Sequence, residues 1–211
     1  MNNTRNTEDE TEMAPPVLRC HFDVGLFDPA WPGQGGEAHY PTMPLRSIAN
    51  MAEGVKAVMK PDSWLFLWTT KSLVAEATAI MRDWGYEPRD TIWWTKLNRF
   101  GVGNPKYGIR RAVEPLLVGT RGDVTAATRI TPDWFAAPVG RHSEKPHHQY
   151  ALIDALCGMD VTRAEFFARH KQPGYLAWGN EVDADFTLAP WGYPVPSDKN
   201  RSRREEVGDG S

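Results

Sequence analysis

The residues best suited to chemistry form the tetrapeptide Asp28-Pro29-Ala30-Trp31, directly after the apolar segment 22–27. A carboxylate at the end of a strand, in a turn stiffened by proline, can accept the N–H bonds of an amine. The amine of a nucleobase is a poor nucleophile because its lone pair is delocalised into the ring. Hydrogen bonds to Asp28 and to the Pro29 carbonyl would localise that pair, while Trp31 stacks on the base. A turn-capping aspartate followed by a core tryptophan is the alternative, and the tetrapeptide by itself favours it.

A second candidate is the segment 96–111, in which basic and aromatic side chains interleave. This composition is typical of a loop that contacts nucleic acid, and a solvated loop is the alternative. The chain carries a formal net charge of −3, so the positive charge that holds nucleic acid would have to be concentrated locally or supplied by a partner. The residues concerned are Lys96, Arg99, Phe100, Lys106, Tyr107, Arg110 and Arg111.

Histidines near Glu144 raise the question of a metal site. His147 and His148 are adjacent, so on a helix they cannot both face one point. We therefore expect no metal at the group formed by Glu144, His142, His147 and His148.

The composition indicates one globular domain. With 211 residues, 41% of them hydrophobic, the chain can bury a single sizeable core. No segment approaches the roughly 18 apolar residues that a membrane span needs, and the polar N-terminus lacks the apolar stretch of a secretory signal. We expect a cytoplasmic protein with no membrane partner. Two cysteines, Cys20 and Cys157, exclude a disulfide scaffold and a zinc site made of cysteines alone, and we expect both to be buried and inert.

Charge and composition divide the chain into three regions. Residues 1–16 carry four acidic residues against Arg5 and end in two prolines, which predicts a disordered acidic leader. Residues 17–197 are formally neutral and should form the single folded domain. Residues 198–211 balance basic and acidic residues and should form a flexible charged tail.

Short apolar runs and helical spacing predict the elements that must position these side chains. Strands are expected over 22–27, 63–70, 91–95, 113–119, 163–169 and 175–179, and helices over 44–51, 72–84 and 145–157. The segments 97–110 and 121–144 should be irregular. Strands that alternate with helices predict an α/β sheet, largely parallel, with helices on both faces. Ligands bind such sheets at the carboxyl ends of the strands, an edge that we expect to hold Asp28, Lys96, Thr120 and Arg169.

A series of short motifs resembles the MT-A70 family of S-adenosylmethionine-dependent adenine-N6 methyltransferases, especially its compact bacterial and phage members. The resemblance runs from about Phe22 to Glu181 and keeps the order of the family's motifs. Each motif is weak alone, but eight in order are specific. They are Asp28-Pro29-Ala30-Trp31, Tyr40-Pro41-Thr42-Met43, Leu65-Phe66-Leu67-Trp68, Trp94-Thr95-Lys96, Glu114-Pro115-Leu116-Leu117-Val118-Gly119, His142-Ser143-Glu144-Lys145-Pro146, Phe166-Phe167-Ala168-Arg169 and Trp178-Gly179-Asn180-Glu181.

The resemblance implies a Rossmann-like methyltransferase sheet in a permuted order, with the catalytic motif before the cofactor-binding strands. It implies that Asp28 and the Pro29 carbonyl hold the target amine and that Trp31 stacks on or walls in the extruded base. Tyr40, Lys96 and Arg110 are then expected to bind the substrate. The cofactor S-adenosylmethionine would be bound by Asp28, Lys145, Arg169, His170, Asn180 and Glu181. Within that set, Lys145 would contact the cofactor carboxylate, and Asn180 with Glu181 the ribose hydroxyls.

Ala30 departs from the family pattern, which has a second proline at this position. The loss of that ring makes the turn less rigid, so we expect activity to be retained, with a lower rate as the alternative. The family also contains non-catalytic subunits, which typically lose the acid, and the presence of Asp28 favours an enzyme.

The function that these observations favour is methylation of adenine N6 in nucleic acid, with DNA as the main substrate. The alternatives are an RNA adenine-N6 methyltransferase and a non-catalytic nucleic-acid-binding partner of such an enzyme. The catalytic contact is made to the base, so the sequence does not separate DNA from RNA. Pairing as a homodimer, or as a heterodimer with a related subunit, is compatible with so short a chain.

Overall fold

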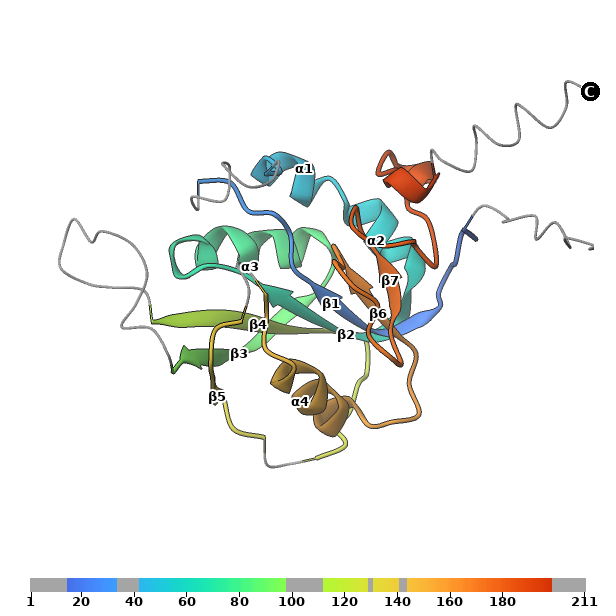
Figure 1. Cartoon of the computed structure of the whole chain (residues 1–211). Helices are drawn as coiled ribbons and strands as arrows, with labels where there is room; N and C mark the ends of the chain where they lie inside the picture. Colours follow the sequence, from blue (N-terminus) through green and yellow to red (C-terminus); the bar gives the residue numbers. More distant parts are fainter. Residues whose placement is uncertain (1–14, 34–41, 98–111, 129–130, 141–143, 199–211) are drawn as a thin grey trace, which may run out of the picture.

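A computed structural model describes residues 15–33, 42–97, 112–128, 131–140 and 144–198. Its centre is a seven-stranded sheet in the order β5-β3-β4-β2-β1-β6-β7 (Figure 1). The strands are β1 (Phe22–Phe27), β2 (Met59–Trp68), β3 (Glu87–Lys96), β4 (Val113–Arg121), β5 (Trp134–Ala137), β6 (Arg163–Phe166) and β7 (Leu176–Trp178). The expected α/β architecture is confirmed, and β1, which carries the tetrapeptide at its end, lies inside the sheet.

One strand reverses the direction of the sheet. β4 runs antiparallel to both of its neighbours, β2 and β3, whereas all other pairs are parallel. Trp64, in the middle of β2, therefore pairs with Thr120, and Trp68, at its end, pairs with Leu116. The expectation that Thr120 lies at the same edge as Asp28 is wrong, because in β4 that edge is formed by the amino end of the strand.

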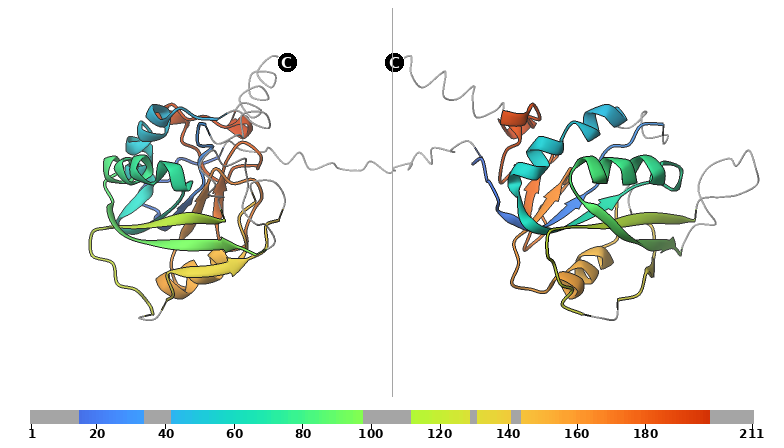
Figure 2. Two further views of the ribbon diagram at one scale, coloured as in Figure 1. Left: turned by 90° about the vertical axis from the view of Figure 1, so that its left-hand side faces the viewer. Right: turned by 180° about the vertical axis from the view of Figure 1, so that it is seen from behind.

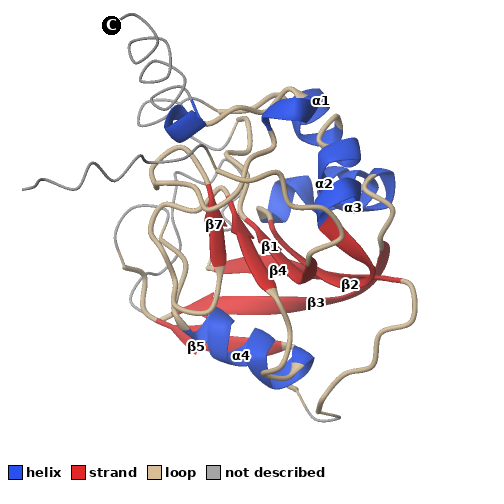
Figure 3. Cartoon of the chain, turned by 90° about the vertical axis from the view of Figure 1, so that its right-hand side faces the viewer, coloured by secondary structure: helices blue, strands red, loops and turns tan. Residues whose placement is uncertain are grey.

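Helices cover both faces of the sheet, as Figures 2 and 3 show. One face packs against α1 (Leu45–Ala49), α2 (Ala52–Val58) and α3 (Val74–Asp83), which follows η1 (Lys71–Leu73). The other face packs against α4 (His148–Cys157). The short η2 (Ala189–Trp191) belongs to a C-terminal segment that completes the first face. Two apolar cores therefore hold the sheet between them, and its edges remain available for a site.

Besides the short η2, two elements were absent from the sequence-based expectation. α2 contains Gly54, which lowers helix propensity, but Val55 and Val58 are fully buried and stabilise the helix by packing. β5 lies between Pro132 and Pro138 in a segment expected to be irregular, and it forms by pairing with β3 at the edge of the sheet. In both cases a tertiary partner decides the local structure.

The two cysteines differ in their environment. Cys157 is buried as expected, and burial raises the pKa of its thiol to about 12. Cys20 is exposed, against expectation. It lies before the first residue of β1, in a bend of the chain with a positive φ of 45°. Within the described ranges, no helix has the length and the apolar character needed to cross a membrane.

Candidate active site

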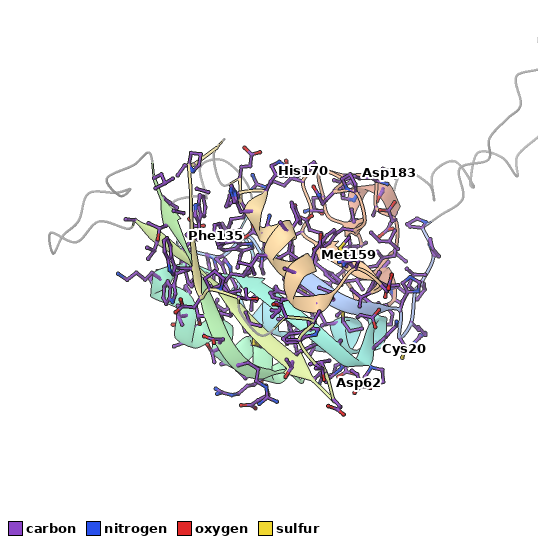
Figure 4. The ribbon with its side chains drawn as sticks, turned by 90° about the horizontal axis from the view of Figure 1, so that it is seen from below. Cys20, Asp62, Phe135, Met159, His170 and Asp183 are labelled. Atoms are coloured by element: carbon purple, nitrogen blue, oxygen red, sulfur yellow. The ribbon has the colours of Figure 1, made fainter. Side chains whose placement is uncertain are left out.

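The carboxyl ends of β1, β3, β6 and β7 meet the amino end of β4 at one edge of the sheet. Asp28 follows β1 directly, and Lys96 ends β3. Glu114 enters this edge from β4, because that strand runs in the opposite direction. Figure 4 shows His170 away from Asp62, which lies in the first half of β2, and from Cys20, which precedes β1.

Four alternating charges form a chain along this edge. The Lys145 ammonium donates to both oxygens of Asp28, at 2.9 and 2.8 Å, and lies 3.8 Å from Glu114 Oε2. The other Glu114 oxygen accepts a hydrogen bond from Lys96 Nζ. The side chain of Lys145 is only 12% exposed, so these contacts are weakly screened by water. The structure thus brings together Asp28, Lys145 and Lys96, which the sequence predicted, and adds Glu114.

The turn after β1 is held by its own hydrogen bonds. The amide of Trp31 donates to the Pro29 carbonyl at 2.9 Å, and the amide of Met43 donates to the Ala30 carbonyl at 2.8 Å. The Trp31 indole N–H donates to the Trp68 carbonyl at 2.8 Å, and only 6% of Trp31 is exposed. Trp31 is a member of the first apolar core, which agrees with the alternative of a core tryptophan, and its burial leaves little ring surface open for stacking on a base.

A half-buried carboxyl, that of Glu165, lies close enough to Asp28 to be affected by its charge. Glu165, on β6, accepts a hydrogen bond from the Tyr150 hydroxyl at 3.0 Å. Burial, with a smaller contribution from the charge of Asp28, raises the pKa of Glu165 to about 7, although the Tyr150 hydrogen bond acts in the opposite direction. Burial and the charge of Glu165 also raise the pKa of Tyr150. A group that titrates near neutral pH therefore lies next to the candidate catalytic carboxylate.

The loops after β6 and β7 approach each other closely. A Cβ at Gly179 would lie 2.2 Å from the Ala168 carbonyl oxygen, so only glycine fits there. Just beyond this approach, Arg169 Nε and Glu181 Oε1 are 3.5 Å apart. Asn180, between Gly179 and Glu181, is exposed. The close approach thus aligns three of the residues expected to bind the cofactor.

The remaining predicted residues are placed as follows. His170 is exposed, and its ring centroid is 6.1 Å from that of His147, at the start of α4. Tyr40 and Arg110, predicted to bind the substrate, lie outside the described residues. In the part of the chain that the structure describes, no three His, Cys, Asp or Glu side chains gather in a way that could hold a metal ion.

Comparison with known proteins agrees with this geometry. The model of the MT-A70 family matches residues 22–181, which is most of the described chain. The chain belongs to the MT-A70 family.

Relatives of this MT-A70 chain differ in size. It is 30% identical over 201 residues to the Type II methyltransferase M.MunI of Mycoplasma sp, which covers 81% of this chain and 82% of that protein. It is 29% identical over 178 residues to the human N(6)-adenosine-methyltransferase catalytic subunit METTL3, which covers 80% of this chain but 30% of the human protein. The Drosophila melanogaster N(6)-adenosine-methyltransferase MT-A70-like protein is 30% identical over 169 residues. The match covers 77% of this chain and 27% of the Drosophila protein. The chain therefore spans about a third or less of the animal relatives and most of the bacterial one.

The described residues of this MT-A70 protein fit the methyl donor of the family. S-adenosylmethionine carries a carboxylate, an ammonium and ribose hydroxyls, for which Lys145, Asp28 and the Asn180–Glu181 pair are chemically suited partners. Trp178, at the end of β7, has a buried indole N–H with no hydrogen-bond partner among the described residues. Charged groups of both signs and the hydrogen-bond donor of Trp178 thus lie where the cofactor is expected to bind.

Sequence reasoning missed three polar residues of this site in the MT-A70 chain. Glu114 belongs to a quoted motif but was given no role, and its signal was a charge at the start of an otherwise apolar strand. Glu165 had a weaker signal, because the four-residue strand β6 carries two charged residues, Arg163 and Glu165. Gln149, buried on α4, had no comparable signal, because its partner is 81 residues away in the sequence.

Proposed function

We propose that this protein transfers a methyl group from S-adenosylmethionine to N6 of adenine in nucleic acid. The observation that carries the proposal is the Asp28 carboxylate, placed directly after a central strand at the ligand-binding edge and paired with Lys145 at 2.8 Å. Membership of the MT-A70 family and the names of the relatives support the same reaction.

Asp28 and the Pro29 carbonyl would act on the amine of the target base. By accepting its two N–H bonds they localise the lone pair on N6 and orient it for in-line attack. When bound, S-adenosylmethionine supplies an electrophilic methyl group on its sulfonium. As the new N–C bond forms and the C–S bond breaks, positive charge develops on N6, and the Asp28 carboxylate stabilises it. The surplus N6 proton then passes to an Asp28 oxygen and on to solvent.

The other residues would bind the methyl donor, enclose the extruded base and contact the nucleic acid. Lys145, which contacts Asp28 and lies near Glu114, would bind the donor carboxylate. Arg169, His170, Asn180 and Glu181 would bind the remainder of the donor. The buried ring of Trp31 would wall in the extruded base, with Tyr40, Lys96 and Arg110 contacting the nucleic acid.

DNA is the substrate that we favour. The bacterial Type II methyltransferase M.MunI is matched over most of both lengths, whereas the chain covers only 30% of human METTL3. RNA and the role of a non-catalytic partner subunit remain the alternatives. A cytoplasmic location and pairing as a homodimer or heterodimer also remain predictions.

The proposal is tested by incubating the protein with S-adenosylmethionine and unmethylated DNA or RNA, followed by digestion and mass spectrometry of the nucleosides. We expect N6-methyldeoxyadenosine from DNA, and a loss of about 100-fold or more in rate for Asp28→Ala. Asp62→Ala is the matched control, because Asp62 is a carboxylate at the opposite edge of the sheet (Figure 4). Wild-type rates in Asp28→Ala would contradict the site, and a folded protein without product on either polymer would favour the partner-subunit role.

A further inference from the structure

Two buried tryptophans lie beneath the lysines of the charge chain. Lys145 Nζ is 5.4 Å from the centre of the Trp68 ring, and Lys96 Nζ is 5.0 Å from the centre of the Trp94 ring. The two rings meet edge to face, with centroids 6.2 Å apart and an interplanar angle of 79°. Both distances allow a cation–π interaction between ammonium and ring. We call Trp68 and Trp94 the tryptophan platform.

Each ring of the platform is fixed by its indole N–H. Trp94 Nε1 donates to the Ala137 carbonyl at 3.0 Å, a contact that any residue at 137 could supply. Trp68 Nε1 donates to the side-chain oxygen of Gln149 at 2.6 Å, a contact that depends on the side chain. Gln149 is 3% exposed on the core-facing side of α4, where an amide is costly unless it is hydrogen-bonded. Its place in the core is therefore explained by the Trp68 ring.

We propose that Gln149 is a positioning residue that acts on the methyl donor through Trp68 and Lys145. By fixing the Trp68 ring, it holds the Lys145 ammonium where it can bind the donor carboxylate. The inference rests on the proposed function, because it assigns the task of Lys145. A lysine has a long flexible side chain, so without an oriented ring beneath it the ammonium samples more positions and binds a carboxylate less tightly.

The structural part of the proposal is tested with Gln149→Leu, which removes the acceptor, and Gln149→Glu, which keeps an oxygen at the same position. The Trp68 indole N–H signal in a nitrogen–proton correlation spectrum is assigned with Trp68→Phe. We expect the signal to move in Gln149→Leu and to stay near its wild-type position in Gln149→Glu. An unmoved signal in folded Gln149→Leu would overturn the proposed contact.

The functional part is tested by calorimetric binding of two donor analogues. S-adenosylhomocysteine carries the amino-acid carboxylate, and methylthioadenosine lacks it. We expect Gln149→Leu to bind S-adenosylhomocysteine about tenfold more weakly and methylthioadenosine as the wild type does, with recovery in Gln149→Glu. Ser63→Ala is the matched control: it removes a buried 2.8 Å contact with Tyr86 near the far end of β2 and should change neither affinity.

A double-mutant cycle separates action through Lys145 from a general loss of packing. In a Lys145→Met background, Gln149→Leu should cause no further loss of S-adenosylhomocysteine affinity. Equal weakening of both analogues, or full additivity with Lys145→Met, would overturn the positioning role while leaving the methyltransferase proposal intact. Failure of the wild-type protein to bind either analogue would instead overturn the proposed function, and the task of Lys145 with it.

Discussion

Lys145 and Glu114 show how much of this site depends on single charges. Asp28 contacts only one described cation, Lys145, and that ammonium is held on its other side by Glu114. A buried ion pair is costly to break because it leaves an uncompensated charge. Removal of Lys145 therefore affects both the geometry of Asp28 and the expected donor site, whereas removal of Asn180 affects the donor site alone.

This difference predicts distinct outcomes for two substitutions. Lys145→Ala should weaken binding of S-adenosylhomocysteine and also lower the midpoint of thermal unfolding, because Asp28 loses its described cation while Glu114 keeps only Lys96. Asn180→Ala should weaken binding, by about tenfold for a lost hydrogen bond to ribose, and leave the midpoint unchanged, because Asn180 is exposed. Calorimetry and a thermal scan measure the two effects. Equal midpoints for both variants would argue against the charge chain as a structural unit.

Glu165 predicts a dependence of stability on pH. Its pKa is raised from 4.5 to about 7 in the folded protein, so between these values the folded state binds more protons than the unfolded state. The free energy of unfolding contributed by this group is therefore highest below pH 4.5 and falls as the pH rises toward about 7, by about 3 kcal/mol at most. Glu165→Gln should remove this decline. Urea unfolding of both proteins between pH 5 and 8 measures the difference, and parallel curves would contradict the assigned titration.

At the scale of elements, the loops after β6 and β7 are aligned by one glycine. Gly179→Ala would place a Cβ 2.2 Å from the Ala168 carbonyl oxygen, so the two loops must separate. We expect a loss of about 1–3 kcal/mol in stability and weaker binding of S-adenosylhomocysteine, because Arg169 and Glu181 follow the contact. Thermal unfolding and calorimetry measure both effects.

Gly54→Ala is the control for this substitution. Its Cβ would lie 3.4 Å from the Trp191 side chain, an ordinary contact within a helix, so the stability should stay equal or rise slightly. If Gly179→Ala behaves like this control, the close approach of the two loops does not position the donor site.

At the scale of the whole molecule, the fold extends beyond the family match, which ends at residue 181. Phe186 and Leu188 are fully buried, and the Phe186 ring lies 4.9 Å from Phe22 and 5.4 Å from Phe166. The backbone adds a hydrogen bond from Asp185 to the Ala177 carbonyl of β7. The segment after the family match is therefore part of the first core.

Truncation after residue 182 should then abolish cooperative unfolding. Loss of a buried phenylalanine side chain alone costs about 3–5 kcal/mol, which is a large part of the total stability of a typical domain. Urea unfolding followed by tryptophan fluorescence measures the effect. Truncation after residue 198 is the control, and it also tests the predicted flexible tail, because it should leave the transition unchanged. A sharp transition in the shorter chain would contradict the structural role of this segment.

The sequence by itself determined those features that depend on neighbours in the chain. The apolar runs gave the core of each central strand, and the tetrapeptide at Asp28 identified the carboxylate because a strand, a proline turn and an aromatic are local signals. The alternation of elements predicted helices on both faces. Lys145 was assigned from a resemblance, and the structure pairs it with Asp28 across 117 residues of sequence.

Only the tertiary structure decided which residues meet at the edge. Because β4 is antiparallel to its neighbours, Glu114 and not Thr120 lies at the edge that holds Asp28. The sequence did not predict this, since hydrophobic periodicity is the same for a parallel and an antiparallel strand. The short strand β5 formed because β3 offered it a partner. Gln149 lies in a helix that the sequence predicted, but its role comes from the Trp68 indole that packing places beside it. Strand direction and the partners of buried polar groups are properties of the assembled sheet, and no local pattern encodes them.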